Sequence, residues 1–328
     1  MAALRVLIIG GYGFFGRRIV QRLSSDAELE VIVAARSLQR AQETARACGQ
    51  PGRARLAAAA LDTSAPLLAA DIEKLGPDIV VLASGPFQGA GYHVARACIA
   101  ARVHYVDLAD GRDFVCGIGA LDREASAAGV TVVSGASSVP ALSSAVADRL
   151  AQGLANVQCI DIGISPGNRT ERGIATMQAI LSYCGKAVPD MDGKPTRGWS
   201  GTRRHVYPEP VGSRLLSPCD VPDLALLPAR YAGTPAVRFA AGLELWFLHR
   251  GMNAMAWLAR LGVVRDWSVH AAWLKRAADW FKRWGSDAGA MHVQVHGTRP
   301  DGRKSMRTWH LLATDGDGPF VPTLAATA

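Results

Sequence analysis

Residues 5–16 read RVLIIGGYGFFG, an apolar run that ends directly in a glycine-rich turn. The run predicts a buried strand, and Gly11, Gly13 and Gly16 follow it in the spacing GxGxxG. In such a turn the first glycine permits a tight bend, the second lets the backbone approach a phosphate, and the third allows close packing of a helix on the sheet. A purely structural glycine turn is the alternative, but the flanking strand and helix favour binding of a dinucleotide pyrophosphate at the helix N-terminus. The predicted contacts are Gly11, Tyr12, Gly13, Phe14, Phe15 and Gly16.

Strands and helices alternate through the first 140 residues. Apolar strands are predicted at 5–10, 30–35, 56–61, 78–83, 104–108 and 130–134, and helices at 13–23, 38–48, 65–75, 90–101 and 113–128. Continuous apolar strands that are linked by helices predict a parallel sheet covered on both faces. The fold class is therefore α/β, with a doubly wound Rossmann domain, and ligands should bind beyond the carboxyl ends of its strands.

The end of the second strand bears on the choice of cofactor. A carboxylate there would bind the ribose 2′-hydroxyl of NAD, but this chain has Arg36 followed by Ser37. A guanidinium suits the 2′-phosphate of NADP(H), to which it can donate two charge-assisted hydrogen bonds. The alternative is that Arg36 is merely a solvated residue at a strand end. We expect NADP(H) as the cofactor.

Loops after the later strands supply further candidates. Asp62 follows the third strand, where it contacts the adenine end of the cofactor or caps the next helix. The fourth strand leads to Ser84, Gly85, Pro86 and Phe87, which are predicted to lie at the nicotinamide ribose unless they form a structural turn. Asp107 ends the fifth strand, either as a catalytic group that orients substrate and shuttles a proton or as a carboxylate that organises the loop.

Composition favours an enzyme of the cytoplasm. The chain of 328 residues is 49% hydrophobic, has no uninterrupted apolar run of membrane-spanning length, and enters a strand too early for a secretory signal. Its six cysteines form no CxxC pair, which is typical of reduced thiols. The formal net charge of +8 favours a small anionic substrate, and no basic run with interleaved aromatic residues predicts nucleic-acid binding.

The second half has a different pattern. A strand is predicted at 157–165, a helix at 173–184, short strands and loops over a cleft at 189–235, and an antiparallel pair at 290–298 and 305–313. Arg203 and Arg204 could hold a substrate carboxylate or phosphate, although a solvated basic turn is the alternative. His292 and His296 share one face of a strand, but without a third ligand they do not predict a metal site.

An aromatic stripe lies in residues 267–284, where Trp273, Ala277, Trp280, Phe281 and Trp284 recur at helical spacing between basic residues. Such a stripe usually packs in a core or at a subunit interface, so we expect a homodimer. A basic amphipathic helix can instead rest on an anionic membrane surface, and this is the less favoured alternative.

Three segments carry a family resemblance: GGYGFFG at 10–16, SGPFQGAGYHVARACIAARVHYVDLADG at 84–111, and VVSGASSVPALSSAVADRL at 132–150. Together they resemble the saccharopine dehydrogenase-like NADP-binding family. The resemblance implies a Rossmann domain at 1–140, an α+β substrate and dimerisation domain with a mixed sheet at 141–318, and a C-terminal segment at 319–328 that returns to the first domain. It also implies a longer chain than the 328 residues here.

The resemblance implies NADP-linked oxidoreductase chemistry without fixing the substrate, because the family includes saccharopine reductases, imine reductases and a trans-acting enoyl reductase. No tyrosine has a lysine four positions later, and residues 135–140 contain no cysteine. These observations argue against the Tyr–Lys and thiolate mechanisms of other dehydrogenases. We expect reduction of an imine, or oxidation of a secondary amine, in an amino-acid-like substrate. The alternatives are a lipid-linked enoyl reductase and a regulatory protein that binds NADP without turnover.

Overall fold

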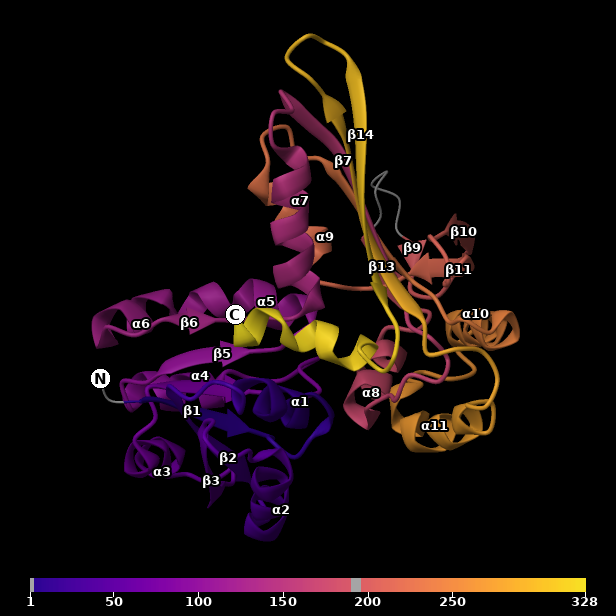
Figure 1. The fold of residues 1–328 in the computed structure, drawn as a ribbon. Coiled ribbons are helices and arrows are strands. Elements are labelled where there is room, and N and C mark those ends of the chain that lie inside the picture. The colour runs from indigo at the N-terminus through magenta and orange to yellow at the C-terminus, as the bar shows by residue number, and fades with distance from the viewer. Residues whose placement is uncertain (1–2, 190–195) are drawn as a thin grey trace. The chain divides into compact units, whose positions relative to one another are not determined.

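The computed structural model describes residues 3–189 and 196–328, which divide into two compact units (Figure 1). Unit 1 comprises the chain up to Ser138 together with Phe320–Ala328, and unit 2 comprises Val139–Pro319. The C-terminal segment is tied to the first helix of unit 1, where Arg22 Nε donates to Thr327 Oγ1 at 2.8 Å.

Within residues 3–138, unit 1 has one six-stranded sheet in the order β3-β2-β1-β4-β5-β6, and its paired strands are parallel. The bounds are β1 Leu4–Ile9, β2 Leu29–Ala35, β3 Arg55–Ala60, β4 Ile79–Leu82, β5 His104–Asp107 and β6 Val132–Val133. The predicted doubly wound sheet is confirmed. Its strand order reverses direction between β1 and β4, which is the switch point where such sheets bind their ligands.

The helices of unit 1 overlap their predicted ranges, but the single helix predicted at 113–128 is divided in two by a 3₁₀ turn. They are α1 Phe14–Leu23, α2 Leu38–Cys48, α3 Leu68–Leu75, α4 His93–Ala100, α5 Arg112–Gly117 and α6 Asp122–Ala128, with the 3₁₀ turn η1 at Ile118–Leu121 between the last two. The core between sheet and helices contains Val6 and Ile8 of β1, Val31 and Val33 of β2, and Ile19 of α1. Strands buried on both faces explain the nearly continuous apolar runs in the sequence.

Unit 2 is built on a mixed sheet in the order β10-β11-β12-β7-β13-β14, so the predicted second sheet is also confirmed. Strands β12 and β7 run parallel, whereas β7 with β13 and β13 with β14 run antiparallel, and the last three form the long ribbon in Figure 1. The bounds are β7 Asn156–Ser165, β10 Arg203–Val206, β11 Ser213–Pro218, β12 Ala236–Ala241, β13 Gly289–Thr298 and β14 Lys304–Ala313. A separate small sheet pairs β8 Ala187–Val188 with β9 Thr196–Arg197.

The helices of unit 2 are α7 Ser143–Ala151, α8 Ile174–Ser182, α9 Asp223–Arg230, α10 Trp246–Arg260 and α11 Ala271–Asp279, with the 3₁₀ turn η3 at Ser268–His270. Helices α7 and α9 supply Ala147 and Leu227 to a core that also holds Ile160, Val237 and Val293 from three strands. Alternation along each strand sends these apolar side chains to one face and polar ones to the other.

Two predictions for the second half need correction, and two elements were not predicted. The segment 189–235 contains helix α9 as well as strands and loops, and its residues 190–195 lie outside those described. Helix α10 and strand β12 carry no predicted counterpart. The helix expected over 267–284 ends at Asp279, so Trp280, Phe281 and Trp284 lie in the turns that follow it.

Candidate functional site

The glycine turn joins β1 to α1, and its geometry explains its composition. Gly10 has a φ of +80°, a conformation that L side chains rarely adopt. A Cβ on Gly16 would lie 2.1 Å from the carbonyl oxygen of Gly10, so only glycine lets α1 pack on the turn. A Cβ on Gly13, in contrast, would meet only the Gly10 carbonyl oxygen, at 3.0 Å, among the described atoms within 4 Å. The open side of the turn is therefore at Gly13.

The N-terminus of α1 lies directly behind this open position. Gly13 is its N-cap, and no described side chain forms a capping hydrogen bond there. The first N–H groups of an α-helix have no intrahelical partner and carry a partial positive charge, so they attract an anion. An uncapped helix N-terminus beside a glycine with free space fits the pyrophosphate of a dinucleotide.

The aromatic residues of the turn have mixed surroundings. Tyr12 is exposed, whereas Phe14 and Phe15 are half-buried with their ring centroids 4.9 Å apart. The guanidinium carbon of Arg18 lies 4.1 Å from the centroid of the Phe14 ring and 5.6 Å from that of Phe320. Phe14 and Phe15 therefore support the turn through their rings.

A cationic corner forms where β2 ends. Arg36 is exposed, and Ser37 caps α2 by accepting a hydrogen bond from the backbone N–H of Arg40 at 3.4 Å. The Arg40 guanidinium carbon lies 5.4 Å from the centroid of the Tyr12 ring, which links this corner to the glycine turn. Two guanidinium groups are thus available near the turn.

Asp62 lies close to the same corner. Its Oδ1 accepts from the backbone N–H of Ser64 at 3.0 Å and from the Ser64 hydroxyl at 2.7 Å. These hydrogen bonds, with a smaller attraction to Arg36, lower the pKa of Asp62. One of our alternatives was that Asp62 caps the next helix. That alternative is wrong, because α3 begins only at Leu68, and Asp62 instead organises a local turn.

The loop after β4 lies against the glycine turn, since a Cβ on Gly10 would meet the Cβ of Ser84 at 2.9 Å. This contact follows from the pairing of β1 with β4. Gly85 and Pro86 continue the loop, but the Phe87 side chain is buried against Phe114 with ring centroids 5.2 Å apart. Phe87 therefore anchors the loop to α5, and only its backbone is open to a ligand.

Asp107 is fully buried and already satisfied. Its Oδ1 accepts from the backbone N–H groups of Ala109 and Gly135 and from the Ser134 hydroxyl, each at 2.9 Å, and its Oδ2 accepts from the Tyr105 hydroxyl at 3.0 Å. Burial outweighs these hydrogen bonds and raises the pKa of Asp107. The geometry favours the loop-organising interpretation over the catalytic one, because this carboxylate holds the ends of β5 and β6 together.

Arg203 and Arg204 do not act as a pair. They are neighbours in β10, so their side chains point to opposite faces, and Arg204 is exposed. Both terminal nitrogens of Arg203 donate to the carboxylate of Asp161 on β7. Burial opposes ionisation of Asp161, but the hydrogen bonds and charges of His292 and Arg203 outweigh it and lower the pKa. The charge of Arg203 is therefore already compensated within unit 2.

The two histidines of β13 have different partners. His292 is fully buried, its Nδ1 lies 2.9 Å from the Tyr207 hydroxyl oxygen, and its ring stacks on His205 with centroids 3.8 Å apart. His296 Nε2 lies 2.9 Å from Gln294 Oε1. In residues 3–189 and 196–328, no three histidine, cysteine or acidic side chains are arranged to hold a metal ion.

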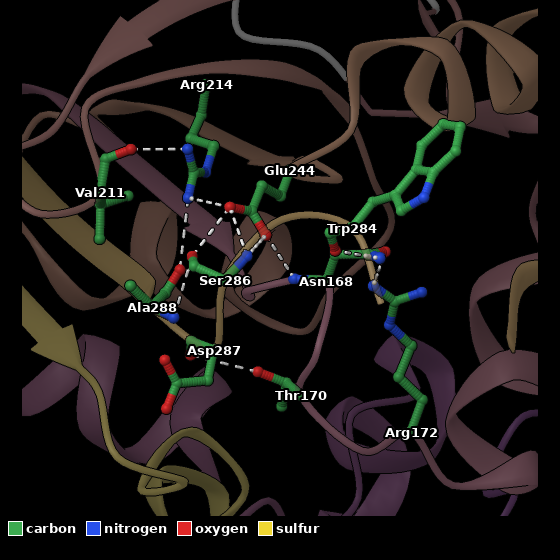
Figure 2. A network of polar contacts seen from close by, with 10 residues as sticks. All are labelled: Asn168, Thr170, Arg172, Val211, Arg214, Glu244, Trp284, Ser286, Asp287 and Ala288. Atoms are coloured by element: carbon green, nitrogen blue, oxygen red, sulfur yellow. Dashed lines mark hydrogen bonds and ion pairs between the residues drawn. The ribbon is translucent and has the colours of Figure 1, made fainter. Parts of the chain in front are cut away.

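A half-buried carboxylate joins three loops of unit 2 (Figure 2). Glu244 follows β12 and accepts from the backbone N–H of Asn168 at 2.6 Å, from the Ser286 backbone N–H at 2.9 Å, and from the Ser286 hydroxyl at 2.8 Å. Arg214 lies 3.4 Å from the same carboxylate. Because β7 and β12 are parallel, the loops after them meet at one edge of the sheet, and Glu244 fixes them there.

The Asn168 side chain extends this network. Its Nδ2 donates to the backbone carbonyls of Phe281 and Trp284 at 2.7 and 2.9 Å, and its Oδ1 accepts from Arg172 at 3.2 Å. Figure 2 shows the Trp284 ring directed away from these hydrogen bonds. The backbone at Trp284 is therefore anchored while its indole is exposed.

Comparison with known proteins agrees with the geometry of unit 1. Residues 6–133 match the family model described as the saccharopine dehydrogenase NADP binding domain. The match begins in β1 and ends with β6, so it spans the whole sheet. Unit 1 belongs to the saccharopine dehydrogenase-like NADP-binding family. It is therefore a nicotinamide dinucleotide-binding domain of an oxidoreductase.

Two solved structures resemble the chain over most of its length. A saccharopine dehydrogenase (L-Glu forming) from Saccharomyces cerevisiae has a TM-score of 0.63 at 15% identity, covering 99% of this chain and 88% of that one. An amine dehydrogenase from Mycobacterium smegmatis has a TM-score of 0.53 at 13% identity, covering 97% and 88%. At these identities the likeness shows the fold alone. Among curated proteins, no sequence matches the chain.

Unit 1 holds one candidate pair that the sequence predictions overlooked. Gln88 Nε2 donates to Asp110 Oδ1 at 3.0 Å, and the two residues follow β4 and β5, which are neighbours in the sheet. Asp110 is half-buried, and burial raises its pKa above the ordinary value of an aspartate. The sequence could have indicated this pair, since side chains that follow adjacent parallel strands meet at the carboxyl edge of the sheet.

In the parts of the chain that the structure describes, no helix combines the length and the apolar character needed to cross a bilayer.

Proposed function

We propose that the protein is an NADP(H)-dependent oxidoreductase that reduces an imine, or oxidises a secondary amine, in an amino-acid-like substrate. The observation that carries the proposal is the open glycine turn at Gly13, with the uncapped N-terminus of α1 behind it, inside a matched NADP-binding domain. The names of the two similar structures, a saccharopine dehydrogenase and an amine dehydrogenase, support chemistry at a carbon–nitrogen bond.

The phosphorylated cofactor is proposed because of the charges beside the turn. Arg36 and Arg40 follow β2 at the position where the ribose 2′ substituent lies in such folds, and Asp62 offsets only part of their charge. Bound NADP(H) would supply the hydride chemistry, which needs no nucleophile from the protein. The chain itself has to bind the pyrophosphate, orient the substrate and move a proton.

We assign Asp110 as the general acid that donates a proton to the substrate. Its raised pKa keeps the carboxyl group protonated to higher pH than an exposed aspartate, so it can donate to a substrate nitrogen. Gln88 fixes its Oδ1, and the buried Oε1 atom of Gln88 lacks a hydrogen-bond partner in the described part of the chain. An unpaired buried acceptor beside an acid suits a substrate that carries N–H groups.

The experiment combines binding and turnover. NADPH binding is measured by fluorescence titration, and oxidation of NADPH is followed with a panel of keto acids mixed with primary amines or amino acids. Asp110→Asn should lower kcat/KM by about 100-fold or more without changing NADPH affinity, as expected for loss of a general acid. Asp113→Asn is the matched control, because that side chain is 94% exposed on the neighbouring helix α5.

The pH profile gives a second readout. A raised pKa means that the wild-type reductive rate falls as pH rises through that value, whereas the Asp110→Asn variant should lack this limb. Full activity in Asp110→Asn would refute its assigned role. Tight NADPH binding with no turnover across the panel would instead favour a protein that binds the cofactor for regulation.

A further inference from the structure

Tryptophans are concentrated in one short part of unit 2. Residues 246–284 contain six of the eight tryptophans in the chain. Five of these are exposed, with exposed fractions of 68% for Trp246, 59% for Trp257, 66% for Trp273, 86% for Trp280 and 57% for Trp284. A single exposed apolar side chain is ordinary, but a group of large ones marks a contact surface. We call these five residues the tryptophan surface.

The tryptophan surface draws residues from α10, from α11 and from the turns that follow α11, all in unit 2. On α10, Trp246, Ala254 and Trp257 are exposed at intervals of about one or more helical turns, and Leu261 is exposed directly after the helix. The ring of Phe247 joins the start of α10 to the turns after α11, since its centroid lies 5.2 Å from that of Phe281 and 5.8 Å from that of Trp284. The start of α10 and the turns after α11 are therefore in contact.

Positive charge surrounds this surface. Residues 246–284 contain seven basic residues, Arg250, Arg260, Arg265, Lys275, Arg276, Lys282 and Arg283, but only two acidic ones, Asp266 and Asp279. Both acids already have basic partners, because Asp279 lies 2.7 Å from Lys275 and Asp266 lies 3.7 Å from Lys186. The other arginine and lysine side chains of this segment are exposed.

The charge pattern argues against contact with a second copy of the chain. A two-fold dimer brings the same patch of each subunit together, so these basic residues would face one another. Like charges across an interface cost several kcal/mol. The sequence-based expectation of a subunit contact at this stripe is therefore less favourable than contact with a negatively charged partner.

We propose that the tryptophan surface binds the anionic phospholipid surface of a membrane. Indole rings partition into the interfacial layer of a bilayer, and adjacent lysine and arginine side chains bind lipid phosphates. Attachment would be peripheral: α10 and the α11 region would contact the membrane surface without crossing the bilayer. This property is separate from the proposed catalytic function and does not depend on it.

Vesicle co-sedimentation of the full chain tests the proposal. Vesicles of phosphatidylcholine alone are compared with vesicles that contain about 30% phosphatidylglycerol, at low and high salt. We expect binding to the anionic vesicles, weakened by salt, and little binding to the neutral ones. The double variant Trp273→Ser/Trp280→Ser should lower the partition coefficient about tenfold or more. Leu67→Ser is its control, since that residue is 68% exposed in unit 1.

The contribution of the basic residues is tested by the same vesicle co-sedimentation. Lys282→Glu/Arg283→Glu should lower partitioning about 30-fold or more, from roughly 1 kcal/mol for each basic residue at the surface. Arg299→Glu/Arg303→Glu, which changes the same charge at the β13–β14 turn, should leave it almost unchanged. Urea denaturation of every variant checks that the fold persists.

Three outcomes would overturn the proposal. The first is absence of binding to anionic vesicles, and the second is equal loss of binding in the hairpin variant. The third is a combined result: light scattering shows a wild-type dimer that dissociates in Trp280→Glu, and the wild-type protein does not bind vesicles. That last result would assign the tryptophan surface to a second copy of the chain.

Discussion

Replacing Gly13 with valine tests the cofactor site most directly. The backbone at Gly13 has a φ of −66° and a ψ of 176°, an extended conformation that any residue adopts. A Cβ there would meet only the carbonyl oxygen of Gly10, at 3.0 Å, among the described atoms nearby. The fold should therefore tolerate the change, with a free energy of unfolding within about 1 kcal/mol of the wild type.

NADPH binding should suffer much more. The valine side chain would occupy the space in front of the uncapped α1 N-terminus, where the pyrophosphate has to approach. A hydrogen bond to a charged group contributes about 1.5–3 kcal/mol, so losing two of them costs about 3–6 kcal/mol. The Kd for NADPH should rise by roughly 100-fold or more.

Gly16→Ala is the matched comparison. A Cβ on Gly16 would lie 2.1 Å from the carbonyl oxygen and 2.8 Å from the carbonyl carbon of Gly10. Since both are backbone atoms, α1 has to move, and overpacking of this kind costs about 1–3 kcal/mol of stability. Fluorescence titration and urea denaturation measure both variants. Unchanged NADPH affinity in a folded Gly13→Val protein would refute the assignment of the turn.

Three further predictions concern single side chains. Arg36→Ala should weaken NADPH by about 1.5–3 kcal/mol and leave NADH almost unchanged in the same titration, and equal losses would make Arg36 structural. Burial raises the pKa of Asp223 to about 6. The folded state then holds a proton that the unfolded state has lost, so the free energy of unfolding falls by about 3 kcal/mol between about pH 4 and pH 7. Urea titrations should show this fall in the wild type and not in Asp223→Asn. Arg203→Ala should destabilise unit 2 by about 2–3 kcal/mol, because it removes the guanidinium partner of the half-buried Asp161 carboxylate and leaves only His292 facing it among the described residues. Arg204→Ala should cost less than about 0.5 kcal/mol, and equal denaturation midpoints for the two variants would contradict a stabilising role of the Arg203–Asp161 ion pair.

The sequence was most informative where structure is local. Each strand of unit 1 is a short apolar run followed by a helix, so periodicity alone indicates β1 to β6 and the edge at which loops gather. Helix α2 matches its predicted range residue for residue, because Ser37 caps it and apolar positions recur along it. The glycine turn is equally local, since the contacts of Gly16 lie within six residues.

Side-chain roles were less predictable because they depend on distant partners. Arg203 looked like a free cation until its partner Asp161, 42 residues earlier, was placed beside it. Asp107 has a partner in Gly135, 28 residues later, and that contact distinguishes a structural carboxylate from a catalytic one. Asp110 and Gln88 were overlooked because their proximity depends on the pairing of β4 with β5.

The hydrogen bonds of Glu244 affect how unit 2 unfolds locally. Glu244 bonds to Asn168, 76 residues earlier, and to Ser286, 42 residues later, so it closes two long loops at once. Such closure is entropically costly and becomes favourable only after β7, β12 and β13 are in place. The amides of the three loops should therefore exchange with solvent deuterium as one cooperative group and faster than those of the sheet. Glu244→Gln should speed exchange in all three loops together, including the backbone that presents Trp284.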